Sequence, residues 1–248
     1  MVADANERRA SDGGEPGLVD ARRRTHQGEH RLPPAAAVVV AGLVYATLPS
    51  SLTVGPRYII PVVEAVLLVA LLASNPVRLV RQGRWSRWVS FGLAGIVVLT
   101  NMVSLGLLVG SVADPSSPAN SLLVAAMQVW LTNVIGFALL FWELDRGGPV
   151  ARRELPRASM PSADFRFSHD EDHDTVDEVR RGSSIDAGWV PVFVDYLYVS
   201  LTNSSAFSPT DTMPLTSRAK LLMGSEATAA LLISLIVVAR AVGSLGGG

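Results

Sequence analysis

The charged residues of this chain are gathered into a few segments, and this segregation limits the possible folds more than any other feature. Residues 1–33 and 145–188 hold most of the charge, and the stretches between them are almost free of it. A soluble domain of this length would carry charges on every exposed helix face, whereas a polytopic membrane protein confines them to its loops. The pattern predicts an integral membrane protein, whose main partner is the lipid bilayer.

Six apolar segments are candidates for crossing that bilayer. A hydrocarbon core of about 30 Å needs roughly 20 mostly apolar residues in each helix. The segments at 35–52, 58–74, 88–112, 121–143, 189–207 and 218–242 meet this requirement to different degrees. The second is short and carries Pro61 and Glu64, and the fifth is weaker because it carries Asp195 and a Ser/Thr/Asn-rich end. We therefore expect an all-α, polytopic membrane protein with about six transmembrane helices.

The arginines predict the orientation of these helices, because cytoplasmic loops retain positive charge. The N-terminal tail holds six arginines, the loop at 75–87 holds four and the segment at 145–188 holds seven. The opposite side holds only Arg57, Arg218 and Lys220, and Arg240 lies on the arginine-rich side in a six-span arrangement. This bias predicts a multi-pass protein of the cell membrane with both termini in the cytoplasm.

The same pattern divides the chain into four parts. Residues 1–33 lack an apolar core, so they are no secretory signal, and their composition is typical of a disordered cytoplasmic tail. A four-helix transmembrane region at 34–144 follows, then a polar cytoplasmic loop at 145–188 and a C-terminal helical hairpin at 189–248.

Several classes of function find no support in the sequence. A net charge of −1 leaves no basic excess for nucleic acid, and the absence of cysteine excludes disulfides and thiolate catalysis. No Ser–His–Asp set or phosphate-binding glycine loop is present, so we predict no enzymatic activity and no cofactor. His169 and His173 have a spacing at which helical histidines can bind zinc. A lone pair in an acidic loop is more often a solvated charge run, so no metal site is predicted.

The region near the C-terminus carries a set of aromatic, hydroxyl and acidic positions: Leu197, Tyr198, Ser200, Leu201, Thr202, Asp211, Pro214, Thr216, the run at 219–222 and Glu226. This set resembles the pore region of two-helix potassium channels. Residues 206–210 stand where a channel has its selectivity filter, but both filter glycines are missing and Pro209 fixes the backbone there. The resemblance therefore implies a degenerate pore region.

A capping pattern gives these residues a second interpretation. Ser208, Pro209, Thr210 and Asp211 fit a capped turn that joins the last two helices on the outer face, and Thr216 or Ser217 can cap the final helix.

The C-terminal half carries four short motifs: Asp164-Phe165-Arg166-Phe167 with Asp170, Asp195-Tyr196-Leu197-Tyr198, Phe207 with Asp211, and Ser217-Arg218. In these motifs it is similar to an uncharacterised family of bacterial multi-pass membrane proteins, known only as a domain of unknown function. This resemblance implies no activity.

Three carboxylates inside predicted spans are candidates for ion or proton binding: Glu64, Asp195 and Glu226. An ionisable group at mid-helix costs about 2.5–3.5 kcal/mol on insertion scales, so it needs a partner or a role. The functional hypothesis is a hydrated cavity that these carboxylates share with a polar face formed by Asn101, Gln128, Tyr198, Thr202 and Ser205. The alternative is that the polar residues only hold the helices together.

Two functions follow as hypotheses. The first is permeation or transport of an ion or small solute, which the pore-like pattern and the intramembrane carboxylates favour. The second is a non-transporting scaffold or partner subunit that acts through its cytoplasmic segments, as a homo-oligomer or with an unknown protein partner.

Overall fold

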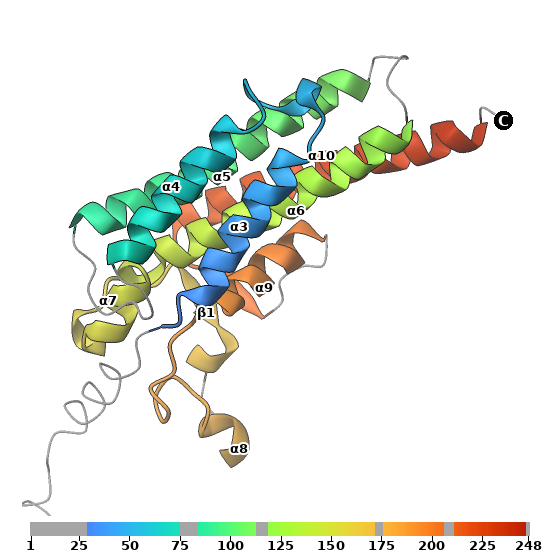
Figure 1. Ribbon diagram of the computed structural model, residues 1–248. Helices are drawn as coiled ribbons and strands as arrows, with labels where there is room; N and C mark the ends of the chain where they lie inside the picture. The colour runs from blue at the N-terminus through green and yellow to red at the C-terminus, as the bar shows by residue number, and fades with distance from the viewer. Residues whose placement is uncertain (1–28, 75–83, 113–118, 172–175, 206–210, 247–248) are drawn as a thin grey trace, which may run out of the picture.

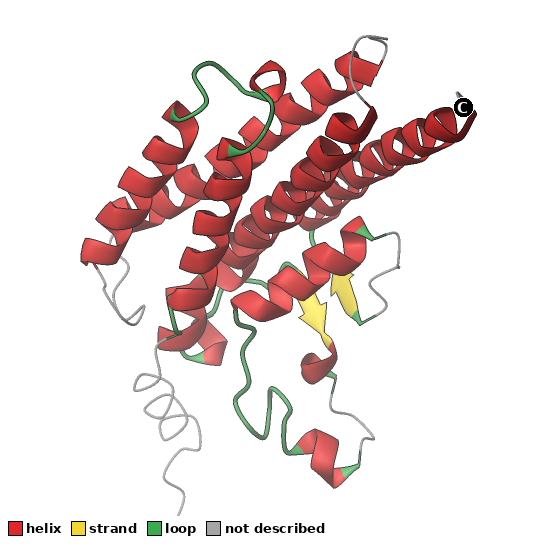
Figure 2. Ribbon diagram, turned by 45° about the vertical axis from the view of Figure 1, so that its right-hand side comes forward, coloured by secondary structure: helices red, strands yellow, loops and turns green. Residues whose placement is uncertain are grey.

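The computed structural model describes residues 29–74, 84–112, 119–171, 176–205 and 211–246. Within these residues the chain folds mainly into helices, together with one two-stranded ribbon (Figures 1 and 2). Five long helices lie alongside one another: α3 (Leu32–Ala46), α4 (Ile59–Ser74), α5 (Arg84–Val112), α6 (Ala119–Leu144) and α10 (Ser217–Gly246). The all-α prediction is thus confirmed.

In the described part of the chain, three helices are long and apolar enough to cross a membrane: Trp85–Val112, Ser121–Gly147 and Ser217–Arg240. The apolar helices at Leu32–Thr47 and Ile59–Ala73 are shorter. The helix α6 lies at the centre, with two-thirds of its apolar window buried. Small residues such as Ala125, Ala126 and Ala138 are fully buried on it, so neighbouring backbones can approach closely.

The bundle has two distinct ends, and we call the end at which α6 terminates the base. Glu29, just before α3, bonds to Trp142 in the last turn of α6, so α3 begins at the base. At the other end of the bundle, Arg240 of α10 donates to the main-chain oxygen of Val112, at the end of α5, over 2.7 Å. The described chain therefore begins at the base and finishes at the opposite end (Figure 1).

The helix α9 (Phe193–Ser204) departs from the predicted fifth span. Its twelve residues rise about 18 Å, well short of a hydrocarbon core of about 30 Å. It starts at the base, where the Phe193 N–H donates to Glu29, and ends beside the middle of α6, where Trp130 donates to the Ser204 oxygen. The fifth span predicted at 189–207 is therefore wrong in length, because α9 is too short to cross such a core.

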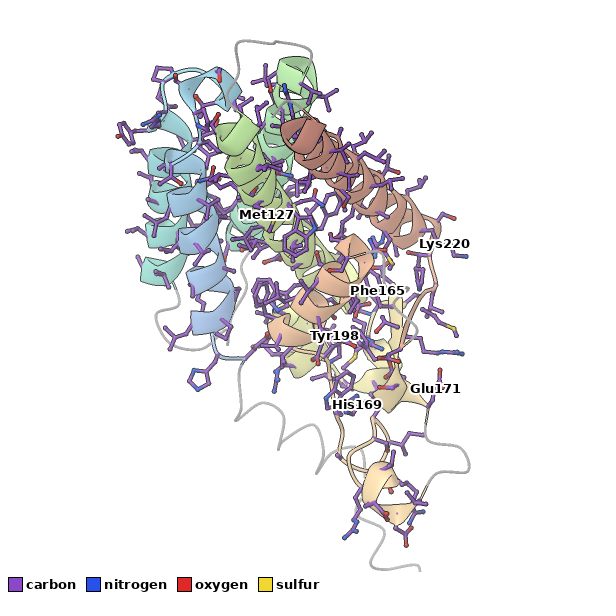
Figure 3. All side chains as sticks on the ribbon, turned by 90° about the vertical axis from the view of Figure 1, so that its right-hand side faces the viewer. Met127, Phe165, His169, Glu171, Tyr198 and Lys220 are labelled. Atoms are coloured by element: carbon purple, nitrogen blue, oxygen red, sulfur yellow. The ribbon has the colours of Figure 1, made fainter. Side chains whose placement is uncertain are left out.

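The segment between α6 and α9 folds against the base. It contains η2 (Asp145–Gly147), α7 (Pro149–Glu154), η3 (Arg157–Ser159), β1 (Phe165–Phe167), η4 (Ser168–Asp170) and α8 (Asp177–Arg180). The strand β1 pairs antiparallel with β2 (Thr212–Pro214), which directly precedes α10. Figure 3 shows Phe165 beside α9, with His169 and Glu171 farther from the bundle.

Most of the predicted capped turn, residues 208–210, lies outside the described part of the chain. The strand β2, which begins at Thr212, lies at the base. The predicted cap of the last helix is present: the Thr216 hydroxyl accepts the Ala219 N–H over 3.3 Å. The short helix η1 (Ser50–Leu52) occupies the connection between α3 and α4.

Candidate functional site

The side chain of Glu226, within α10, is fully buried and faces α9. One of its oxygens, Oε1, contacts the Ser200 hydroxyl and accepts a hydrogen bond from the Ser204 hydroxyl over 3.0 Å. The other oxygen, Oε2, accepts from the Asn203 amide over 2.7 Å. A carboxyl group in the interior of the bundle is thus held by three neutral side chains of one short helix.

The spacing of these residues on α9 explains why they converge. Positions 200, 203 and 204 are three and four apart, so they share one helix face. The same face buries Tyr196 and Val199 nearer the base, where the larger side chains fill the space against α6. Because the polar residues are short, α9 and α10 can pack closely around Glu226.

No Lys or Arg among the described residues forms an ion pair with Glu226. A buried carboxylate without a cationic partner is costly, since three neutral hydrogen bonds replace only part of its hydration. The site therefore favours either a proton on the carboxyl group or a bound cation beside it.

A line of polar side chains leads from Glu226 through the interior. The Asn133 amide donates to the main-chain oxygen of Glu226 over 3.4 Å. Asn101 of α5 donates to Asn133 over 3.2 Å and accepts from the Thr132 hydroxyl over 2.5 Å. Three helices are thus linked by polar contacts at one level of the bundle.

The line ends at a small cavity beside Glu64 of α4. Tyr45, Thr100, Asn101 and Thr132 are among the residues that line this cavity. Glu64 is buried, and among the described residues its Oε2 atom has no hydrogen-bond partner. A polar cavity of this kind is where a protein holds internal water.

Gly42 of α3 makes room for the Glu64 carboxyl. A Cβ atom at Gly42 would lie 3.0 Å from the Glu64 Oε2 atom, a tight contact with a buried oxygen. A side chain at this position would therefore displace the carboxyl group or separate α3 from α4.

The structure separates the remaining predicted site residues from this line. Asp195 lies in the first turn of α9 at the base, where its carboxylate accepts the Val192 N–H over 2.7 Å. Thr202 and Ser205 bond to carbonyl groups of their own helix, and Tyr198 is about half exposed. Gln128 bonds to Thr47 toward the opposite end of the bundle. Of the predicted set, Glu64, Asn101 and Glu226 are brought into one polar line.

Sequence reasoning missed Ser200, Asn203, Ser204 and Asn133. The polar face of α9 was predicted from Asp195, which selects positions 198, 202 and 205. The face of α9 that is buried is displaced by one to two positions from the predicted one. The aromatic and small residues at 193, 196, 200 and 204 would have indicated this face in the sequence.

A second polar cluster lies at the base, around Asp145. This fully buried carboxylate accepts the Asp164 N–H over 2.7 Å and the Tyr196 hydroxyl over 2.6 Å. Arg152, also fully buried, donates to the main-chain oxygens of Trp142 and Asp145, and its guanidinium lies 4.9 Å from the Tyr196 ring centre. The cluster joins the end of α6 to α7, β1 and α9.

The base cluster continues into the start of α10 and of α3. Asp164 is paired with Arg218 over 2.5 Å and accepts from Thr216. Glu29 lies 4.0 Å from Arg152, and burial raises the pKa of its carboxyl group despite the nearby guanidinium. Each of these charged residues has a partner within the fold, so we interpret the base cluster as structural: it holds the helix ends together.

The histidine pair predicted to be solvated is only partly described. His169 stacks on Trp189 with ring centres 4.3 Å apart, and His173 lies outside the described residues. Among the described residues, no group of three or more possible ligands could hold a metal ion.

A scan against protein-family models found no match, and searches of the curated proteins and of the solved structures found none either.

Proposed function

We propose that the chain is a multi-pass membrane protein in which α3, α4, α5, α6 and α10 cross the bilayer and α9 is a re-entrant half-helix. The base faces the cytoplasm in this arrangement, because Glu29 after the arginine-rich tail, Arg87 near the start of α5 and the segment that follows α6 lie at that end. The C-terminal end of α10 then lies on the outer side.

The function that this geometry supports best is translocation of a small cation, either a proton or an alkali cation. One observation carries the proposal: Glu226 is fully buried in a long apolar helix and is held by Ser200, Asn203 and Ser204 of a helix that ends halfway. Intramembrane carboxylates that face the interior of a bundle are typical of ion and proton pathways. Half-helices that end at mid-depth serve the same purpose in transporters.

The line of polar side chains supplies a route across the interior of the bundle, from α10 to α4. Asn133, Asn101 and Thr132 connect the level of Glu226 to the cavity at Glu64. In this proposal Glu226 is the first binding site of the pathway and Glu64 is the second.

The test is flux into proteoliposomes that contain the purified full-length chain. We expect an imposed potential to drive uptake of a cation, and we expect Glu226→Gln to lower the rate to about a tenth or less. Glu178→Gln is the matched control, because Glu178 is an exposed carboxylate on α8 and should leave the rate unchanged. Equal rates for wild type and Glu226→Gln would contradict the proposal.

One observation favours the scaffold hypothesis as a second candidate. The segment around α8 exposes Val176, Val179 and Ile185, although it lies outside the long apolar helices. Such a patch would suit a protein partner. In this case Val179→Asp should abolish a stable complex while leaving any cation flux intact, and a complex that survives the substitution would remove this candidate.

A further inference from the structure

The hydroxyl group of Ser200 makes two close contacts that bear on the protonation of Glu226. Its oxygen lies 2.7 Å from the main-chain oxygen of Val134 on α6, and it also contacts Oε1 of Glu226. A hydroxyl group has one hydrogen, and a carbonyl oxygen can only accept. The two contacts need two hydrogens, so the second one must come from the carboxyl group.

We infer that Glu226 is held as a neutral carboxylic acid and that the species bound at this site is a proton rather than an alkali cation. The inference rests on the proposed function for its role in translocation, since it names the cation of that same site. In this arrangement Glu226 donates to Ser200, and Ser200 donates to the Val134 oxygen.

The other contacts of the carboxyl group fit this assignment. The side-chain nitrogen of Asn203 lies 2.7 Å from Oε2 and 2.9 Å from the main-chain oxygen of Met223. Both of those atoms are acceptors, so the amide must present its NH₂ group to the site. Ser204 can donate its hydroxyl hydrogen to Oε1. Each close polar contact of the Glu226 carboxyl group then contains one hydrogen between its two heavy atoms, as a hydrogen bond requires.

An alkali cation would need a different set of groups. Hard cations are bound by several oxygen atoms whose lone pairs converge on the ion. Here Asn203 offers hydrogens instead of its oxygen, and the Ser200 hydroxyl is already placed between two oxygen atoms.

Charged groups on the neighbouring helices have other partners. On α9, Asp195 accepts from the Val192 N–H and Tyr196 donates to Asp145. On α6, Glu143 lies in the last turn, where Ser90 donates to it, and on α5 the guanidinium of Arg87 lies over the Phe91 ring. None of these provides a counter-ion for Glu226, so a proton is what neutralises it.

Release of the proton also follows from this geometry. The O–H bond of Glu226 breaks and the proton leaves to water, while the carboxylate keeps the electron pair. The Ser200 hydroxyl then turns from the Val134 oxygen toward Oε1 and donates to the new charge. Ser200 is thus a positioning residue that serves both states of the carboxyl group.

The experiment combines infrared difference spectroscopy with flux, on the full-length chain in liposomes. At neutral pH we expect the C=O band of a protonated carboxylic acid, lost in Glu226→Gln and retained in Glu178→Gln. The internal pH should change with an imposed potential in a buffer free of sodium. Other buried carboxyl groups can contribute to the same region, so the decisive spectrum is the difference between wild type and Glu226→Gln. A difference spectrum without the C=O band of a protonated acid would overturn the inference.

The flux measurement separates the inference from the proposed function. Sodium or potassium uptake that depends on Glu226, without a change of internal pH, would overturn the proton assignment and keep the translocation function. The band without flux of any cation would support the neutral acid and overturn the function.

The role of Ser200 is tested by Ser200→Ala, which should shift the C=O band and lower proton flux to about a tenth. Ser200→Thr keeps the hydroxyl group and should restore both readouts, which separates this role from a failure to fold. Ser225→Ala is the matched control, because Ser225 is exposed on α10 and donates to the Leu221 oxygen of its own helix. An unchanged band and flux in a folded Ser200→Ala protein would contradict the positioning role.

Discussion

At the scale of single residues, Asp145 holds the base together. Its two oxygens accept from the Asp164 and Phe165 N–H groups and from the Tyr196 hydroxyl, and Arg146 lies 3.3 Å away. Removing a buried carboxylate that is paired and fully hydrogen-bonded strongly destabilises the fold, because its partners are left without an acceptor.

The prediction for this residue concerns stability. We expect Asp145→Asn to lower the free energy of unfolding by about 3 kcal/mol, and Tyr196→Phe by about 1–2 kcal/mol because it removes only one donor. Thermal unfolding of the purified protein in detergent measures both. Tyr198→Phe is the control, because its exposed hydroxyl lies 3.4 Å from Asp211 and should matter little. Equal melting temperatures for Asp145→Asn and Tyr198→Phe would contradict the account.

The sequence revealed some of these residues and concealed others for a physical reason. Glu64 and Glu226 stand out because a charge within an apolar run is expensive wherever the helix packs. Ser200 and Asn133 do not stand out, because serine and asparagine are cheap to bury once they find a partner. Which of them face the interior depends on the rotation of α9 and α6, and the composition of a short helix does not fix that rotation.

At the scale of elements, α9 depends on a residue outside its own segment. Glu29 accepts the Phe193 N–H over 2.7 Å and the Trp142 indole N–H over 2.9 Å. It therefore caps the first turn of a half-helix from the start of the chain. Glu29, which lies just before α3, thus contributes to the stability of α9.

A pH dependence follows from this cap. Burial raises the pKa of Glu29, so the fold favours its protonated form relative to the unfolded chain. The contribution is present at low pH and is lost as pH rises through the raised pKa. We expect hydrogen-exchange protection at the start of α9 to fall as pH increases, and Glu29→Gln to flatten this dependence. Glu178→Gln should leave it as in the wild type, and a dependence that survives Glu29→Gln would contradict the prediction.

The elements also differ in how well the sequence predicted them. Long apolar helices such as α5 and α6 follow directly from the hydrophobic runs, since an apolar stretch of that length has few alternatives. The ribbon of β1 and β2 was not foreseen, because each strand has three residues and pairs with a partner far along the chain. The length of α9 was misjudged because a half-buried helix and a weak span have similar composition.

At the scale of the whole molecule, the shortness of α9 makes the number of crossings odd instead of even in the proposed arrangement. The two described ends of the chain lie at opposite ends of the bundle (Figure 1). In the proposed arrangement the positive-inside count still fits the base as the cytoplasmic end: relative to the six-span prediction, Arg218 and Lys220 move to the base side and Arg240 moves to the opposite side.

Labelling of single cysteines tests this topology, and the natural chain has no cysteine to interfere. We expect Leu215→Cys and Glu178→Cys to react with an impermeant reagent from one side of the membrane. Gly55→Cys and Val242→Cys should react from the other side. If Val242→Cys reacted from the same side as Glu178→Cys, the last helix would not cross as proposed.

The ribbon at the base also sets an order for biogenesis. The strand β1 leaves the ribosome well before β2. The ion pair between Asp164 and Arg218 therefore cannot form until α9 and the start of α10 have been synthesised. Contacts between distant parts of a chain form late, because the intervening loop must close first. Synthesis of the final helix therefore completes the contacts of the base. A chain truncated just before residue 212 would lack β2, Arg218 and Glu226, so the contacts of the base could not form. A chain truncated after Arg240 would keep all three.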